Sequence, residues 1–311
     1  MFALALFGSV SRKTDDLHSD RDLLIVCNSK LRYELHNKYC EQGYSVSTMT
    51  GKQLACMNEN GSLFIQHLKS EAQIFFDRDG ELHKFLSNCE LVPPTSLELQ
   101  RCKATLQFIA SCPDTLSLSA WKADFLYCIS RDYLIKEIAK TNKLAFGLED
   151  IAKVSMYQFG FKLEELDLLR QLRIAKTSYR SNEPISSDIR NTTSRWLDIL
   201  NEKFSINLRG VPSFEVDSFI NFTKDQKFNS NYERLRSMEG LYLIARAEGL
   251  IHPDHDRLIE HIVNPNLYGS SKACKIKQIE TYLCDIRRLL HRRYIKEAIL
   301  PHRFATLQLC S

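Results

Sequence analysis

Two acidic residues separated by a single residue are the strongest candidates for chemistry in this sequence. Asp20 and Asp22 open an apolar segment that predicts a β-strand. Alternation along a strand places both carboxylates on one face, about 7 Å apart. Mg²⁺ prefers oxygen ligands of this kind and keeps positions open for phosphate oxygens. Two such ions stabilise the attacking and leaving oxygens of an in-line phosphoryl displacement, so the pair predicts a magnesium site.

A Gly-Ser pair precedes the acidic pair, at the end of another apolar segment. Gly8 and Ser9 follow the apolar run 2–7. A glycine permits close backbone approach and a serine supplies a hydroxyl donor, which suits a triphosphate. Arg12 and Lys13 follow in a polar loop and can neutralise phosphate charge. We therefore expect a strand, a Gly-Ser turn, a polar loop and a second strand that begins with the acidic pair.

The elements that must position these residues are short and alternate along the first part of the chain. Apolar patterns predict strands over 2–7, 22–26, 44–49 and 74–76. Helical spacing of apolar residues predicts helices over 30–42 and 62–70, and a turn is expected over 77–80. The mixture indicates an α+β fold with a mixed sheet and helices.

The rest of the chain has long helical patterns. Pro93 and Pro94 mark a boundary, and few glycines (11) and prolines (8) disfavour a turn-rich all-β fold. We expect three domains: a compact domain over 1–92, a helical bundle domain over 96–180 and a mainly helical C-terminal domain over 185–311.

The Gly-Ser turn and the acidic pair, in this order, resemble the signature of the nucleotidyltransferases of the DNA polymerase β superfamily, particularly its small prokaryotic branch. The stretch 60–77, with an apolar helix, a strand and an acidic turn, resembles the same branch, so the resemblance covers about residues 1–90. It implies a mixed-sheet palm-like fold, dependence on Mg²⁺ or Mn²⁺, and transfer of a nucleoside monophosphate from a nucleoside triphosphate such as ATP. By the motif match, Gly8 and Ser9 would face the triphosphate, and Asp20 and Asp22 would be the catalytic, metal-binding residues.

The sequence departs from this family at a third carboxylate, which these enzymes usually carry on the next strand to help activate the attacking hydroxyl. Here that strand is 44–49, and Ser45 or Ser47 occupies the corresponding place. Glu41 and Asp77 are the alternatives elsewhere in the chain. The helical remainder faintly resembles domains that accompany such enzymes, including the HEPN type. HEPN ribonucleases carry an Arg followed a few residues later by His, and Arg173 lacks this His, so a nuclease role is not expected.

The acceptor and the competing functions stay open. The acceptor could be a nucleic acid end, a protein hydroxyl or a small molecule. One alternative function is a catalytically silent nucleotide- or nucleic-acid-binding module of the same fold. Another is an antitoxin-like modifier that transfers AMP to a partner protein. A third is a nucleic-acid-binding scaffold based on a basic amphipathic helix within 272–303.

Composition limits the compartment and the partners. The net charge of +4 does not by itself indicate a nucleic-acid partner. The stretch His252–Asp256 is interpreted as the start of a helix and not as a metal cluster. None of the ten cysteines forms a Cys-x-x-Cys pair, so we expect free thiols in a reducing cytoplasm. No apolar run has the length of a membrane span, so no membrane partner is expected.

Overall fold

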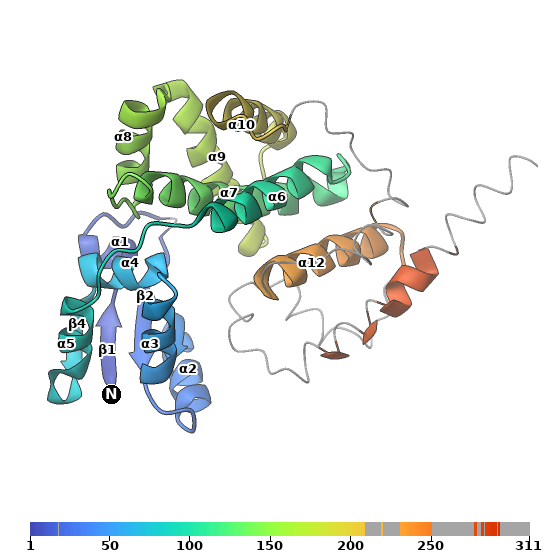
Figure 1. Ribbon diagram of the computed structural model, residues 1–311. Helices are drawn as coiled ribbons and strands as arrows, with labels where there is room; N and C mark the ends of the chain where they lie inside the picture. The colour runs from blue at the N-terminus through green and yellow to red at the C-terminus, as the bar shows by residue number, and fades with distance from the viewer. Residues whose placement is uncertain are drawn as a thin grey trace, which may run out of the picture. The chain divides into compact units, whose positions relative to one another are not determined.

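The computed structural model describes residues 1–17, 19–208, 219, 231–250, 277–278, 281–282, 284–290 and 292. The chain divides into two compact units (Figure 1). The first unit consists of Met1–Ala104 and Tyr127–Ile174, and the second of Thr105–Leu126 and Ala175–Ser311. Each unit is therefore built from two separate stretches of chain. The three domain ranges expected from the sequence stay a prediction.

A four-stranded mixed sheet forms the centre of the N-terminal part of the first unit. Its strands are β1 (Ala3–Leu6), β2 (Asp22–Val26), β3 (Ser45–Met49) and β4 (Gln73–Asp77), in the order β3-β2-β1-β4. β1 pairs antiparallel with both β2 and β4, and β2 pairs parallel with β3. The sheet and the many helices confirm the α+β class. All four strands lie where the apolar patterns predicted them, to within two residues at each end.

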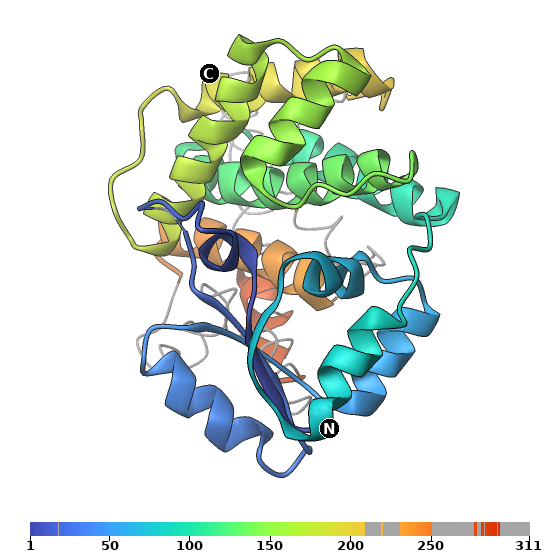
Figure 2. The same ribbon diagram turned by 90° about the vertical axis from the view of Figure 1, so that its left-hand side faces the viewer.

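Helices cover both faces of the sheet, because the strands alternate two sets of apolar side chains. The helices are α1 (Gly8–Arg12), α2 (Arg32–Cys40), α3 (Gly51–Glu59), α4 (Leu63–Glu71) and α5 (Glu81–Ser87), with a short 3₁₀ turn at Arg78–Gly80. Leu24 and Val26 pack with Leu54 and Leu68 of α3 and α4 on one face. The opposite face, with Leu23 and its neighbours, packs against α2. In Figure 2 the sheet is seen nearly edge-on, with α2 on one side and α3 and α5 on the other.

Three of these helices, α1, α3 and α5, were not expected from the sequence. Gly8 and Ser9, expected as a turn, are the first two residues of α1, so the turn and the start of the expected polar loop form one short helix that ends at Lys13. α3 begins with a capping box, in which the Thr50 hydroxyl accepts from the Gln53 backbone N–H and the Gln53 side chain accepts from Thr50 N–H. The third, α5, begins after Gly80. The Thr-x-x-Gln spacing is a signal for α3 that could have been found in the sequence.

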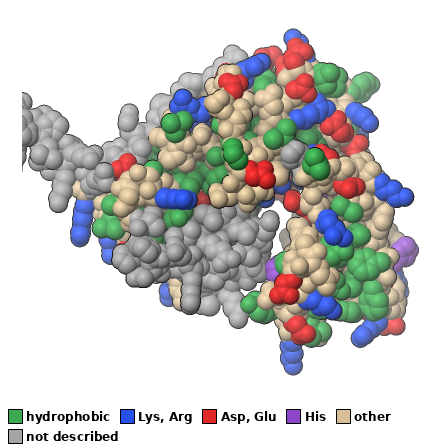
Figure 3. All heavy atoms as spheres, turned by 180° about the vertical axis from the view of Figure 1, so that it is seen from behind, with side chains coloured by type: hydrophobic (Ala, Val, Ile, Leu, Met, Phe, Trp, Pro, Cys, Tyr) green, Lys and Arg blue, Asp and Glu red, His purple; other side chains and the backbone are tan. Residues whose placement is uncertain are grey.

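The remaining described helices are long, as expected from the sequence. They are α6 (Ser96–Ser111), α7 (Leu116–Ala139), α8 (Leu148–Phe159), α9 (Leu163–Arg180), α10 (Ile189–Phe204) and α12 (Asn231–Ala247). None of the helices in the described part of the chain is long and apolar enough to cross a membrane. On the face shown in Figure 3, positive and negative side chains are interspersed over the described residues.

Two expectations fall largely outside the described residues. The stretch His252–Asp256 is not described, and only parts of the expected basic helix within 272–303 are. Within those parts Ile286 and Leu290 are buried and Arg288 is exposed, in keeping with an apolar stripe and a basic outer face.

Candidate functional site

Gly8 and Asp22 meet at one end of the sheet. The Phe7 backbone N–H donates to the Asp22 carbonyl oxygen at 3.1 Å, which extends the β1–β2 pairing to the turn. Gly8 has a φ of +76°, and a Cβ at this position would lie 2.7 Å from Oδ2 of Asp22. Only glycine satisfies both the backbone angle and the close approach. The Gly-Ser turn is thus in contact with the second residue of the acidic pair.

The two acidic residues differ in how firmly the sheet holds them. Asp22 is half-buried and is the first residue of β2, on the same face of the sheet as Leu24. Asp20 is exposed and lies in the loop before the strand. The regular alternation that would fix the separation of the two carboxylates therefore begins only at Asp22.

The turn itself is tied to its surroundings by several hydrogen bonds. The Ser11 hydroxyl donates to the Gly8 carbonyl oxygen at 3.0 Å, and the Thr14 N–H donates to the Ser9 carbonyl oxygen at 3.0 Å. The side-chain amide of Gln73, on β4, donates to the Ser11 carbonyl oxygen. These contacts fix the backbone around Gly8 and Ser9. Ser9 itself is half-buried in the first turn of α1.

Arg12 and Lys13, both expected near phosphate, have different surroundings. The Arg12 guanidinium forms an ion pair with Glu71 of α4, and both side chains are largely buried. His67 contacts the same Glu71 oxygen at 2.7 Å and stacks on the ring of Phe146, with ring centroids 4.5 Å apart. Lys13 is exposed and ends α1 in a left-handed conformation. Of the two cations, Lys13 is the one whose side chain extends into solvent.

Serine occupies the strand position where the family resemblance predicts a third carboxylate. Ser45 is the Cα partner of Asp22 in the parallel β2–β3 ladder, and Ser47 is the partner of Leu24. Both serines share the sheet face of Asp22, because partners in a ladder point to the same side. Within the ladder, a hydroxyl therefore stands next to Asp22 at the position where the family resemblance predicts an acid.

The two alternative carboxylates, Glu41 and Asp77, lie in different parts of the fold. Asp77 is the partner of Ala3, at the opposite end of β1 from the Gly-Ser turn. Its two carboxylate oxygens accept from the N–H groups of Leu82 and His83 at 3.0 and 2.8 Å, so Asp77 anchors the start of α5. Glu41 follows α2, which returns the chain to the end of the sheet where β3 starts. By its place in the fold, Glu41 is the nearer of the two to the acidic pair.

The donor set at this end of the sheet consists of oxygen atoms. Mg²⁺ is usually held by one or two carboxylates, together with waters and substrate phosphates. Asp20 and Asp22 with a neighbouring serine hydroxyl fit that description. Among the described residues, no group of three or more His, Cys, Asp or Glu side chains forms a metal site. A metal held by this pair would take its remaining ligands from waters and substrate phosphates.

Charged residues of the acidic loop, α7 and α9 act on the buried phenol of Tyr127. Tyr127 of α7 is buried, and burial raises the pKa of its phenol. The charges of Arg131 and Arg173 lower this pKa, and the charge of Asp20 raises it. Arg131, Arg173 and Asp20 therefore each lie within electrostatic range of Tyr127. The sequence carries no periodicity or motif that marks Tyr127 or Arg131 as part of this site.

Arg173 holds the loop that precedes β2. Its guanidinium binds both carboxylate oxygens of Asp16, with Nη1 at 2.7 Å from Oδ2 and Nη2 at 2.8 Å from Oδ1. Nη2 also donates to the Ser19 hydroxyl at 3.2 Å. In the sequence, Arg173 drew attention only because of the faint resemblance to HEPN domains. Its ion pair with Asp16 is a role that this resemblance did not predict.

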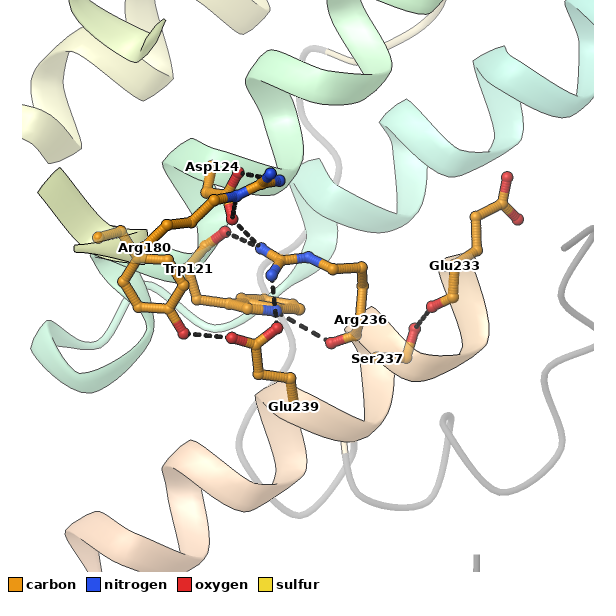
Figure 4. A network of polar contacts seen from close by, with 8 residues as sticks. Trp121, Asp124, Arg180, Glu233, Arg236, Ser237 and Glu239 are labelled. Carbon is orange, nitrogen blue, oxygen red and sulfur yellow. Dashed lines mark hydrogen bonds and ion pairs between the residues drawn. The ribbon is translucent and has the colours of Figure 1, made fainter. Parts of the chain in front are cut away.

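A second group of polar side chains is buried in the other unit (Figure 4). Asp124 of α7 receives two hydrogen bonds from Arg180 of α9, at 2.9 and 3.2 Å, and forms an ion pair with Arg236 of α12 at 2.9 Å. Arg236 also pairs with Glu239, and the Tyr179 hydroxyl donates to the other Glu239 oxygen. Two acidic and two basic side chains are thus paired within this network.

The indole of Trp121 and the rings around Arg236 complete this network. The Trp121 indole N–H donates to the Arg236 carbonyl oxygen at 2.9 Å. The Arg236 guanidinium lies over the rings of Phe125 and Tyr179, at 5.5 and 6.0 Å from their centroids. The network joins α7, α9 and α12 within this unit, which indicates a role in holding the helices together.

Comparison of the chain with protein-family models, with curated proteins and with solved structures found no match in any of the three. The functional conclusion therefore rests on the residues and geometry of this chain.

Proposed function

We propose that the chain is a metal-dependent nucleotidyltransferase that moves a nucleoside monophosphate from a nucleoside triphosphate to an acceptor. The observation that carries this proposal is the contact between the Gly8 backbone and the Asp22 carboxylate. A turn suited to phosphate and a carboxylate suited to metal can act on the same metal-bound triphosphate only if they lie side by side. Their contact supports a single site for a metal-bound triphosphate.

Each residue of the site has a distinct task in this proposal. Asp20 and Asp22 hold Mg²⁺ or Mn²⁺, which neutralises charge on the phosphate oxygens when bound. Gly8 lets the backbone approach the triphosphate, and Ser9 offers a hydroxyl and a backbone N–H. Exposed Lys13 supplies a positive charge to the phosphates, whereas Arg12 stabilises the packing of α1 against α4 through Glu71.

The acceptor is proposed only as a class. A nucleic acid end, a protein hydroxyl and a small-molecule hydroxyl all supply the same attacking oxygen, so the chemistry at the phosphate is shared. AMP transfer to a partner protein is one form of this reaction. The eight described cysteines are free thiols, which supports the proposal of a reducing, cytoplasmic compartment.

Nucleotide transfer with labelled substrates tests the proposal. The intact chain is incubated with each labelled nucleoside triphosphate, Mg²⁺ or Mn²⁺, cellular RNA and a protein lysate. We expect transfer of label that falls on the order of 100-fold in Asp22→Asn, because the metal loses a ligand. Asp15→Asn is the matched control, since it removes a carboxylate from the same loop outside the pair. Equal transfer by wild type and Asp22→Asn would contradict the enzyme proposal.

A second candidate is a nucleotide-binding module without turnover, and the pairing of Ser45 with Asp22 favours it. In that case the chain binds a triphosphate with Mn²⁺ and transfers no label. Isothermal titration with a non-hydrolysable triphosphate separates the two candidates, because binding is expected in both and transfer only in the first.

A further inference from the structure

The loop between α1 and β2 carries Asp20, and it is stabilised by contacts of its own. The Ser19 N–H donates to the Asp16 carbonyl oxygen at 3.0 Å. The Asp16 N–H donates to the Ser19 hydroxyl at 2.9 Å, and that hydroxyl donates to Oδ1 of Asp16 at 3.0 Å. Asp16 and Ser19 thus form a small closed turn immediately before Asp20.

Arg173 binds this turn from the middle of α9. Its Nη1 and Nη2 atoms donate to the two oxygens of the Asp16 carboxylate. This bidentate geometry fixes the orientation of the two groups as well as their distance. Its side chain is 19% exposed, against 49% for Asp16, so the contact is made at the edge of the unit. The residue joins the loop to a helix 157 residues away in sequence.

The charge of Arg173 also acts beyond Asp16. Arg173 and Arg131 both lower the pKa of Tyr127, and Asp20 raises it, so the three charges act on the same buried phenol. Asp16, Asp20 and Asp22 would repel one another in the absence of positive charge. By pairing with Asp16, Arg173 reduces the net negative charge of the acidic loop.

We propose that Arg173 is a positioning residue that holds Asp20 in register with Asp22 for metal binding. The inference rests on the proposed function, because it assigns Arg173 to the same metal site. Asp22 is placed by the sheet and by Gly8, whereas Asp20 lies in the loop and is placed through the Asp16–Ser19 turn. Arg173 makes no contact with substrate in this scheme, and its effect is transmitted through Asp16.

The test measures Mn²⁺ alone, by electron paramagnetic resonance of the full chain. We expect Arg173→Ala to weaken Mn²⁺ binding about 10-fold, the size typical of removing a residue that orients a metal ligand. Arg173→Lys keeps the charge and loses the two-pronged contact, so an intermediate loss is expected. Hydrogen exchange of the α1–β2 loop should become faster in both variants.

Arg170→Ala is the matched control on the same helix. Arg170 is one turn before Arg173 and pairs with Glu149 and Asp167, neither of which belongs to the loop. We expect it to leave Mn²⁺ affinity within about 2-fold of wild type. The charge swap Asp16→Arg with Arg173→Asp should recover much of the lost affinity, because it restores the pair with its polarity reversed.

The outcomes separate the inference from the proposed function. Unchanged Mn²⁺ affinity in Arg173→Ala, equal losses in Arg173→Ala and Arg170→Ala, or no recovery in the charge swap would each overturn the role of Arg173. Absence of Mn²⁺ binding by the wild-type chain would instead overturn the proposed metal site itself. If turnover is present, excess Mn²⁺ should restore the rate of Arg173→Ala, which a purely structural loss would not allow.

Discussion

At the scale of single residues, the position that decides the site is Gly8. The left-handed φ of +76° disfavours any side chain, and a Cβ would collide with the Asp22 carboxylate. We expect Gly8→Ala to displace Asp22 or the turn and to lower Mn²⁺ affinity and nucleotide transfer at least about 10-fold. Titration of Mn²⁺ and the label-transfer assay measure the two effects.

Gly43→Ala is the control that separates backbone strain from the collision. Gly43 has a similar φ of +81°, but nothing lies within 4 Å of the Cβ that it would gain. Both variants should lose about 1 kcal/mol or more of stability in urea unfolding. Only Gly8→Ala should lose metal affinity, and an equal loss in both would mean that the contact with Asp22 is not what matters.

At the scale of elements, the pairing of β2 with β3 determines where a third carboxylate can act. Ser45 is the neighbour of Asp22 in this ladder, on the same face. We expect Ser45→Asp to tighten Mn²⁺ binding and to raise transfer about 10-fold or more, because it adds a metal ligand and a base for the attacking hydroxyl. Mn²⁺ should also raise the melting temperature of this variant more than that of wild type.

Ser47→Asp provides the comparison for this prediction. Ser47 lies two residues further along β3, next to Leu24. If the register decides the effect, Ser47→Asp should change binding and transfer less than Ser45→Asp does. A larger gain from Ser47→Asp would mean that the place for a third carboxylate is at residue 47 and not at residue 45. No gain from either variant would favour the nucleotide-binding module without turnover.

The elements also show what the sequence could and could not predict. The strands were predictable because their apolar residues alternate or run together. The five-residue α1 was missed because it is too short to show a helical period. The contact between Gly8 and Asp22 depends on the antiparallel pairing of β1 with β2, which the strand patterns alone leave open.

At the scale of the whole molecule, contacts between distant segments were the hardest to predict. Local patterns assign residues to contiguous ranges, whereas each compact unit joins two stretches separated along the chain. The contact of Arg173 with Asp16 spans 157 positions and has no periodicity that would predict it. The same holds for the buried network of the second unit, because lone Asp, Arg and Glu residues within helices usually indicate a solvated face.

That network predicts a pH dependence of stability. Glu239 is fully buried, and burial raises its pKa to about 7, against the lowering effects of Arg236 and the Tyr179 hydroxyl. The folded state then keeps a proton that the unfolded state releases above its ordinary pKa near 4.5. The contribution of this group to stability is therefore complete at low pH and is lost as the pH rises toward about 7.

Urea unfolding followed by tryptophan fluorescence measures this effect. Both tryptophans, Trp121 and Trp196, belong to the second unit, so the signal reports on the part of the chain that holds Glu239. The unfolding free energy of wild type relative to Glu239→Gln should fall between pH 5 and pH 7, by up to about 1.4 kcal/mol per pH unit, and then level off. Glu248→Gln, just after the end of α12, is the control and should show no such difference. A relative stability that stays constant from pH 5 to pH 8 would mean that Arg236 keeps Glu239 ionised throughout, and the network would then be a permanent set of ion pairs.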